Sequence, residues 1–332
     1  MTSASAAALD IRNLRTEFKI GEGWYPAVRD LSLSLAPNET LAIVGESGSG
    51  KSVTALSILG LLPRAGARIG AGEVLFDGRD LAKLSEREMS MVRGNAIAMI
   101  FQEPMTSLNP TMTVGEQIAE AIVIHRDGSR KAAMAEALRL LKEVKIPSAE
   151  SRIHDYPHQF SGGMRQRVMI AMALACRPRI LLADEPTTAL DVTIQAQVLL
   201  QLNELKQAYG MSVLFITHNL GVVAQIADRV AVMYAGEVVE LADVDTLFAR
   251  PTHPYTEALL RAMPRADQSS DSLDPIPGSV PALTAMPPGC AYAPRCPYRQ
   301  VRCEEQRPEL APAKDASHLV RCPVRIAAEV SA

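Results

Sequence analysis

Residues 45–52 read Gly45-Glu46-Ser47-Gly48-Ser49-Gly50-Lys51-Ser52. It has the spacing G-x-x-x-x-G-K-S, follows the apolar run 40–44, and leads into a helical pattern that begins at Val53. A glycine-rich loop between a strand and a helix closes its backbone N–H groups around phosphates, and the helix dipole adds positive potential there. The stretch therefore predicts a nucleoside triphosphate site rather than a plain turn before a core helix.

The residues of this phosphate loop have separate expected tasks. We expect Lys51 to reach the β- and γ-phosphates and the Ser52 hydroxyl to ligate Mg²⁺. We expect backbone contacts to the phosphates from the other residues of the site, which are Gly45, Ser47, Gly48, Ser49, Gly50 and Val53.

Length and composition indicate a globular protein with about two domains, or one large domain with an appendage. The 332 residues are 48% hydrophobic and 21% charged, and the net charge of −3 gives no electrostatic reason to expect nucleic acid as a partner. The N-terminus lacks the features of a secretory signal, and the apolar run 55–62 is far shorter than the roughly 20 residues that span a bilayer. We expect a cytoplasmic chain that meets a membrane only through a partner.

Two acidic residues follow a short buried strand predicted at 180–183. An acidic pair at such a strand end suits phosphoryl chemistry, with Asp184 serving Mg²⁺, usually through water, and Glu185 activating a water nucleophile. The alternative is a solvated turn, which a buried strand aimed at a phosphate loop makes a weaker interpretation.

Gln102 and His218 also stand directly after predicted strands, at 97–101 and 213–217. Open α/β sheets place ligand-contacting side chains at strand ends. We therefore expect Gln102 at the site and His218 near the γ-phosphate, although a single histidine in such a place is often structural.

A second helix start carries free backbone donors. Ser161-Gly162-Gly163 precede a helical pattern at 164–176, which makes this helix N-terminus a second potential anion site. Taken by itself, the motif favours a plain serine N-cap.

Aromatic residues are rare, at 4% of the chain, yet Phe18, Trp24 and Tyr25 lie close together around a predicted hairpin loop at 21–25. One of these rings is expected to stack on a nucleotide base, and packing along an edge strand is an equally good interpretation.

The chain changes character near residue 264, where frequent prolines exclude long helices. Four of the five cysteines follow, with the spacing C-x5-C-x6-C-x18-C; they are Cys290, Cys296, Cys303 and Cys322. In a reducing compartment such clustering favours metal or redox chemistry over disulfides. The spacing is neither a ferredoxin run nor a zinc-finger pattern, so an iron–sulfur cluster, zinc and free thiols all stay open.

Taken in order, these motifs resemble the ATP-binding subunits of ABC transporters. The phosphate loop, Gln102, Ser161–Gln166, Ile180–Glu185, Ala189-Leu190-Asp191 and His218 match that family's Walker A, Q-loop, signature, Walker B, D-loop and H-loop. One departure is Met164, where most of the family has glutamine; since Ser161 and backbone N–H groups bind the anion, we expect it to be tolerated.

This resemblance implies an α/β fold: a P-loop NTPase ABC cassette with a mixed sheet core, an antiparallel β subdomain and a helical subdomain, plus a small Pro- and Cys-rich C-terminal appendage. The expected boundaries are a flexible tail at 1–8, the ATP-binding domain at 9–262 with its helical subdomain at about 103–177, and the C-terminal extension at 263–332.

Three further stretches, at 46–54, 101–110 and 252–256, look like the D-type ATPases of dipeptide, oligopeptide and nickel importers. This resemblance implies an ATPase that powers uptake of dipeptides or oligopeptides, with nickel or another small solute as the alternative. The implied partners are an F-type ATP-binding subunit in a heterodimer, two integral membrane permeases and an extracytoplasmic solute-binding protein, and the implied location is the cytoplasmic face of the inner (plasma) membrane, where the chain is peripheral.

The family pattern also implies roles for single residues. Ser161 and Gly163 would close with Gly162 on ATP held by the partner subunit, and Asp191 would lie at the subunit interface. Glu185 would polarise the attacking water, His218 would hold the γ-phosphate, and Gln102 and Asp184 would serve Mg²⁺. Phe18 aligns best with the family's adenine-stacking aromatic, with Tyr25 as the alternative.

Some members of this subfamily carry a [4Fe–4S] cluster in the C-terminal region, and the resemblance assigns its ligands here to the four clustered cysteines, with zinc as the alternative. Two other functions remain rivals. A non-transport ABC ATPase acting on DNA or ribosomes would be expected to carry a coiled-coil insertion, a second cassette or a basic face, and none is visible in the sequence. A small-molecule kinase would leave Ser161-Gly162-Gly163 without a task.

Overall fold

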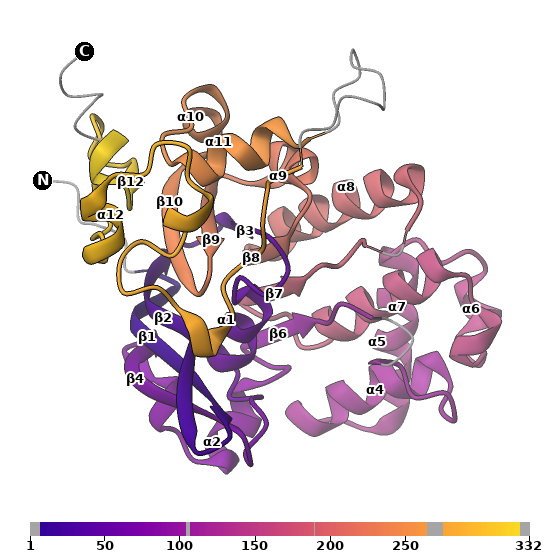
Figure 1. Cartoon of the computed structure of the whole chain (residues 1–332). Coiled ribbons are helices and arrows are strands. Elements are labelled where there is room, and N and C mark those ends of the chain that lie inside the picture. The colour runs from indigo at the N-terminus through magenta and orange to yellow at the C-terminus, as the bar shows by residue number, and fades with distance from the viewer. Residues whose placement is uncertain (1–6, 104–106, 189, 264–274, 326–332) are drawn as a thin grey trace, which may run out of the picture. The chain divides into compact units, whose positions relative to one another are not determined.

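The computed structural model describes residues 7–103, 107–188, 190–263 and 275–325 of the chain. These residues pack as two compact units. The phosphate-loop unit takes its residues from Leu9–Ser34, Thr40–Ala82 and Ile216–Ala332, and the helical unit from Met1–Ala8, Leu35–Glu39 and Lys83–Phe215. Figure 1 shows the elements of both along the chain. The extension after residue 275 thus belongs to the same unit as the phosphate loop.

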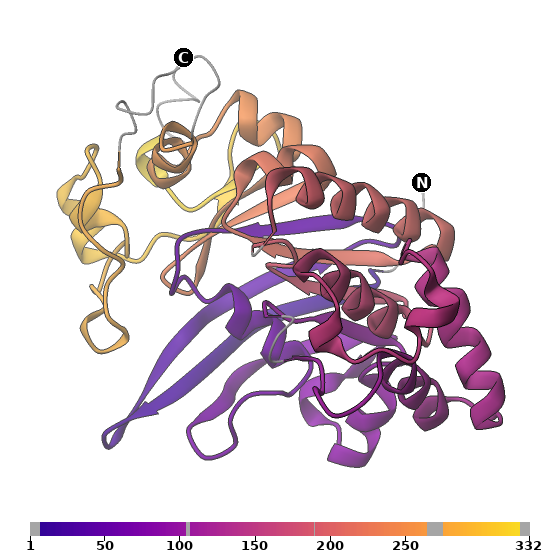
Figure 2. The ribbon, with the colours of Figure 1, turned by 90° about the vertical axis from the view of Figure 1, so that its right-hand side faces the viewer.

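An antiparallel sheet fills one part of the phosphate-loop unit. Its order is β2-β1-β4-β5, and its strands are β1 (Leu9–Ile20), β2 (Gly23–Leu35), β4 (Ala67–Phe76) and β5 (Arg79–Asp80). Apolar and polar residues alternate in β1 and at the end of β2, which is the pattern of half-buried strands, and the leucines of both strands are buried. The two strands form the long hairpin drawn in indigo in Figure 2.

A mixed sheet carries the phosphate loop in the same unit. β3 (Thr40–Val44) pairs in parallel with β9 (Arg229–Tyr234), which pairs antiparallel with β10 (Glu237–Asp243). Every residue of β3 is buried, which explains its continuous apolar run. The helices of this part, among the residues that the structure describes, are α1 (Lys51–Ile58), α9 (Leu220–Ile226), α10 (Val244–Ala249) and α11 (Pro254–Arg261).

The extension continues this mixed sheet. Its short strands β12 (Leu319–Val320) and β11 (Ala311–Pro312) add to β10, and α12 (Val301–Glu305) is short, as the prolines predicted. A buried carboxylate ties the parts together: Glu240 accepts hydrogen bonds from the backbone N–H groups of Thr252 and His253, each at 2.8 Å, and contacts His318 Nε2 at 2.7 Å.

The helical unit contains the parallel strands β6 (Ile97–Ile100) and β7 (Ile180–Asp184). Its helices are α2 (Glu86–Val92), α4 (Val114–His125), α5 (Arg130–Glu143), α6 (Ala149–Arg152), α7 (Gly162–Leu174) and α8 (Val192–Tyr209). Capping boxes begin α2 at Ser85 and α4 at Thr113. In each box the hydroxyl accepts from the backbone N–H of a glutamate three residues later, and the carboxylate of that glutamate accepts from the backbone N–H of the capping residue. β8 (Ser212–Thr217) runs from this unit into the other.

Within the described ranges, none of the helices combines the length and the hydropathy needed to cross a bilayer. The domain boundaries expected after residues 8 and 262, and the helical subdomain expected at about 103–177, remain predictions. The two units are groups of closely packed residues, and such groups need not coincide with domains.

Candidate functional site

The phosphate loop begins at a glycine that no other residue could replace without movement. Gly45 has φ of 153°, and a Cβ there would lie 2.2 Å from the carbonyl oxygen of Met233 in β9. Gly48 has φ of 78° but faces open space, so only its backbone conformation favours glycine. The loop is thus fixed against the sheet at its first residue and exposed at its centre.

Lys51, the first residue of α1, lies across this loop and is 6% exposed. Its ammonium group donates to the carbonyl oxygens of Gly45 at 2.8 Å and Glu46 at 3.0 Å. The Ser49 hydroxyl is buried and has no hydrogen-bond partner among the described residues. A lysine, a helix N-terminus and an unsatisfied hydroxyl within eight residues form a site suited to phosphate oxygens.

The aromatic residues of this unit have different surroundings. Trp24 packs under the guanidinium of Arg68, 4.2 Å from the ring centre, which commits that ring to a contact within the protein. Phe18 in β1 and Tyr25 in β2 are half-buried, and the choice between them as the base-stacking ring stays a prediction. The hairpin turn is shorter than expected, because Trp24 and Tyr25 already belong to β2.

His218 directly follows β8 and is exposed. Its neighbour Asn219 caps α9 by accepting hydrogen bonds from the N–H groups of Gly221 and Val222, at 3.0 and 3.3 Å. His218 thus lies at a strand end, as the sequence predicted.

The acidic pair lies at the end of β7 in the helical unit. Asp184 is the last residue of the strand and is 5% exposed. Glu185 adopts φ of 46°, a left-handed conformation that costs a non-glycine residue about 1–3 kcal/mol and is often found at functional sites. Its Oε2 accepts hydrogen bonds from Gln102 Nε2 at 3.1 Å and from Thr188 Oγ1 at 3.0 Å.

This contact brings together two residues that the sequence placed separately, Gln102 and Glu185. Thr188 is a contributor that sequence reasoning missed. The sequence signal for Thr188 was its position three residues after Glu185, because a turn can bring a hydroxyl side chain back to a residue three positions earlier.

The signature and the D-loop both begin helices of the helical unit. Ser161 caps α7, accepting from the N–H of Met164 at 3.4 Å, and Gly162 and Gly163 form the first turn. Asp191 caps α8, accepting from the N–H of Ile194 at 2.9 Å. Serine capping, which was the alternative interpretation of this motif, is therefore observed. Ser161 and Gly162, at the start of the helix, are exposed. Ala189 lies outside the described residues.

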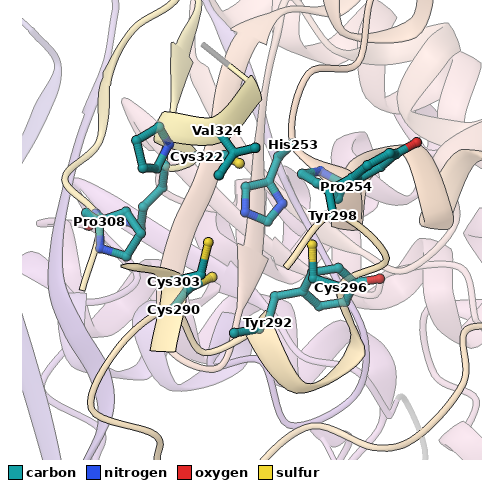
Figure 3. Close-up of a pocket in the computed structure, with 13 residues that line it drawn as sticks. His253, Pro254, Cys290, Tyr292, Cys296, Tyr298, Cys303, Pro308, Cys322 and Val324 are labelled. Carbon is teal, nitrogen blue, oxygen red and sulfur yellow. The ribbon is translucent and has the colours of Figure 1, made fainter. Parts of the chain in front are cut away.

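The four clustered cysteines line one pocket of the extension. Figure 3 shows Cys290, Cys296, Cys303 and Cys322 around the imidazole of His253. All four are free thiols and are buried or half-buried. Among the described residues, no group of three or more His, Cys, Asp or Glu side chains is arranged to hold a single metal ion.

The protonation of this pocket follows from burial. Burial raises the pKa of Cys290 to about 11, and neighbouring Cys322 and Cys296 add to the shift. The pKa values of Cys296 and Cys322 are raised for the same reason, again with a contribution from a nearby cysteine. Burial lowers the pKa of His253 to about 4. Burial therefore favours the neutral forms of Cys290, Cys296, Cys322 and His253.

Comparison with known families assigns the two parts of the chain. Residues 28–188 match the family "ABC transporter", and residues 239–303 match "Oligopeptide/dipeptide transporter, C-terminal region". The dimeric structure of an ATP-binding cassette in a post-hydrolysis state, bound to ADP and Pi, is similar with a TM-score of 0.64 and 30% identity, over 71% of this chain and 98% of that one. The phosphate loop and the Asp184-Glu185 strand end therefore belong to an ATP-binding cassette.

Similar full-length relatives exist in Bacillus subtilis. The chain is 53% identical to the dipeptide transport ATP-binding protein DppD, over 95% of this chain and 93% of the relative. It is 50% identical to the oligopeptide transport ATP-binding protein AppD, over 95% of each. The chain belongs to the ABC transporter ATP-binding proteins, in the group that carries the oligopeptide/dipeptide transporter C-terminal region. The predicted fold class, an ABC cassette with a mixed sheet and helices, is confirmed.

Proposed function

We propose that this chain is the ATP-hydrolysing subunit of an ABC importer for dipeptides and oligopeptides. One observation carries the proposal: an ATP-binding cassette and the oligopeptide/dipeptide transporter C-terminal region occur in one chain, and relatives named for dipeptide and oligopeptide transport match it along 95% of its length. The nickel alternative is less favoured, because these relatives are named for peptides.

Each residue of the site has a separate role in ATP hydrolysis. The phosphate loop and Lys51 bind the phosphates of ATP, and Ser52 with Asp184 and Gln102 serves Mg²⁺. Glu185 polarises the attacking water, and the hydrogen bonds from Gln102 and Thr188 fix the direction of its carboxylate. His218 holds the γ-phosphate, and Phe18 or Tyr25 stacks on the base.

Coupling to transport requires a second subunit. Ser161, Gly162 and Gly163 at the exposed start of α7 close on ATP held by an F-type ATP-binding subunit, with Asp191 at the same interface. The pair then acts on two membrane permeases at the cytoplasmic face of the membrane, supplied by an extracytoplasmic solute-binding protein. Family membership supports this assembly.

Co-purification and uptake test the transport function. The tagged chain is expressed with the products of its neighbouring genes, and we expect integral membrane permeases and a second ATP-binding subunit to co-purify with it. Cells that carry Glu185→Gln in place of the natural chain should lose uptake of labelled dipeptides and keep normal nickel uptake. Association with ribosomes or DNA, or loss of nickel uptake alone, would contradict the proposal.

We also propose that the cysteine pocket binds a [4Fe–4S] cluster. Four thiols line one pocket. The raised pKa values of Cys290, Cys296 and Cys322 reflect burial first and repulsion between thiolate forms second, and bound iron would relieve both. A cubane bonds each thiolate to a different iron, whereas zinc draws four sulfurs to within about 2.3 Å of one point. The resemblance to subfamily members that carry such a cluster favours it over zinc.

Metal analysis after anaerobic purification tests this assignment. We expect brown protein with about four iron and four sulfide per chain. Cys322→Ser should lose the colour, whereas Cys176→Ser, a buried cysteine of the helical unit, should keep it. Stoichiometric zinc, or four thiols that alkylate freely in the purified protein, would refute the cluster.

A further inference from the structure

The C-terminal extension reaches the phosphate loop through a single side chain. Arg295 Nη1 contacts both carboxylate oxygens of Glu46, the second residue of the loop, at 3.0 and 3.2 Å. The Arg295 side chain is 4% exposed and that of Glu46 is 29% exposed. This pair joins positions 249 residues apart in the sequence, and its low exposure sets it apart from ordinary surface ion pairs, which contribute little.

Arg295 is itself held on several sides. Its Nε donates to the carbonyl oxygen of Pro277 at 2.7 Å, and its Nη2 donates to that of Ile276 at 3.1 Å. The guanidinium also lies 5.7 Å from the ring centre of Tyr234 and 5.9 Å from that of Tyr292. Because these contacts fix the planar group, the position of the Glu46 carboxylate is fixed as well.

Glu46 transmits this constraint to the phosphate-binding atoms. Its backbone N–H donates to the hydroxyl of Tyr255 in α11 at 2.9 Å. Its carbonyl oxygen accepts from the Lys51 ammonium at 3.0 Å and from the N–H of Ser49 at 3.2 Å. A displacement of Glu46 would therefore move the carbonyl oxygen to which both the Lys51 ammonium and the Ser49 N–H donate.

We propose that Arg295 is a positioning residue of the nucleotide site: by holding Glu46, it keeps the first turn of the phosphate loop in the conformation that binds ATP. The C-terminal extension is then a structural part of the nucleotide site, in addition to any role of its cysteines. Arg295 does not touch the nucleotide, and it acts through Glu46 and the backbone of the loop.

ATP affinity, measured by equilibrium titration of the full-length chain with a fluorescent ATP analogue and Mg²⁺, tests this role. Arg295→Gln should raise the Kd for ATP about ten-fold, the expected size for loss of a partly buried charge-assisted pair. Arg295→Lys keeps the charge without the planar fork and should give an intermediate Kd. The control is Arg299→Gln, which removes another arginine of the extension. Its carboxylate partner, Glu304, lies within the extension itself, so the Kd of this variant should not change.

A double-mutant cycle separates positioning from general damage. Glu46→Gln should raise the Kd as Arg295→Gln does, and the double variant should be no worse than either single one, because both remove the same contact. Additive effects, or an unchanged Kd for Arg295→Gln, would refute the proposal. If Arg295→Gln fails to fold, the Kd of the Glu46→Gln variant for ATP decides. An unchanged Kd in that variant would refute the positioning role of the Arg295–Glu46 pair.

The proposal rests on the nucleotide site at the phosphate loop. Failure of the unmodified chain to bind ATP would refute that site. ATP binding that is insensitive to both Arg295→Gln and Glu46→Gln would refute only the positioning role.

Discussion

The side-chain amide of Gln102 donates a hydrogen bond to the carboxylate of Glu185, at 3.1 Å, across 83 positions of sequence. Glu185 therefore has a defined direction before any substrate arrives. Replacing it by glutamine keeps its shape and removes its basicity, so Glu185→Gln should bind ATP normally while phosphate release falls by about 100-fold or more. Near-normal turnover in a phosphate-release assay would remove Glu185 from the base role.

Thr188 supplies the second hydrogen bond to Glu185, at 3.0 Å. Thr188→Val keeps the size of the side chain and removes the hydroxyl, so kcat should fall about five-fold, the effect of one lost hydrogen bond of about 1 kcal/mol. KM for ATP should not change, because the phosphates are bound elsewhere. Thr188→Ser restores the hydroxyl and should restore kcat; a serine variant as slow as the valine variant would show that the hydroxyl is not what matters.

Lys51 is the main cation of the phosphate loop and is nearly buried. Lys51→Ala removes charge-assisted hydrogen bonds and should weaken ATP binding at least about ten-fold in equilibrium titrations. Lys145→Ala is a suitable control, because Lys145 forms an exposed pair with Glu204 and lies outside the loop. Equal ATP affinity in the two variants would contradict the assignment of the phosphate site.

Gly45 and Gly48 form a matched pair for testing the loop, since both have positive φ and only Gly45 lacks room for a Cβ. Gly48→Ala should lower the free energy of unfolding by about 1 kcal/mol, through backbone strain alone. Gly45→Ala adds a clash with the Met233 carbonyl and should cost about 2 kcal/mol more. Urea denaturation measures both, and equal losses would contradict the close approach of the loop to β9.

Glu240 is fully buried and bonded to two backbone N–H groups and His318. Glu240→Gln cannot satisfy these partners equally, because its amide nitrogen donates where the carboxylate accepted. The free energy of unfolding should fall by about 1–3 kcal/mol. Glu204→Gln, at an exposed pair, should change it by less than about 0.5 kcal/mol. Similar losses in both variants would show that the buried network contributes nothing.

Much of the fold could be predicted from the sequence because its signals are local. The glycine spacing at 45–52, the alternation in β1 and the apolar run of β7 each identify an element by themselves, and the strand ends then locate Gln102, Asp184, Glu185 and His218. The start of α2 depends on a smaller signal, because a 3-10 turn at Leu81–Lys83 precedes it and the Ser85 capping box begins the helix.

The contacts of the extension could not be predicted in this way. Arg295 and Glu46 are separated by 249 positions, and Glu240 and His318 by 78. Neither arginine nor histidine stands out in a proline-rich segment, and pairing over such distances depends on the folded path of the chain. The sequence likewise indicated a cysteine cluster but not that the buried imidazole of His253 lies beside it.

The pairing of β12 with β10 has a consequence for truncated forms of the protein. Leu319 and Val320 cover the outer edge of β10. A chain cut before Leu319 would leave that edge uncovered, as a template for joining to strands of other chains. Such truncated chains are therefore prone to aggregate, and this short strand protects the solubility of the protein.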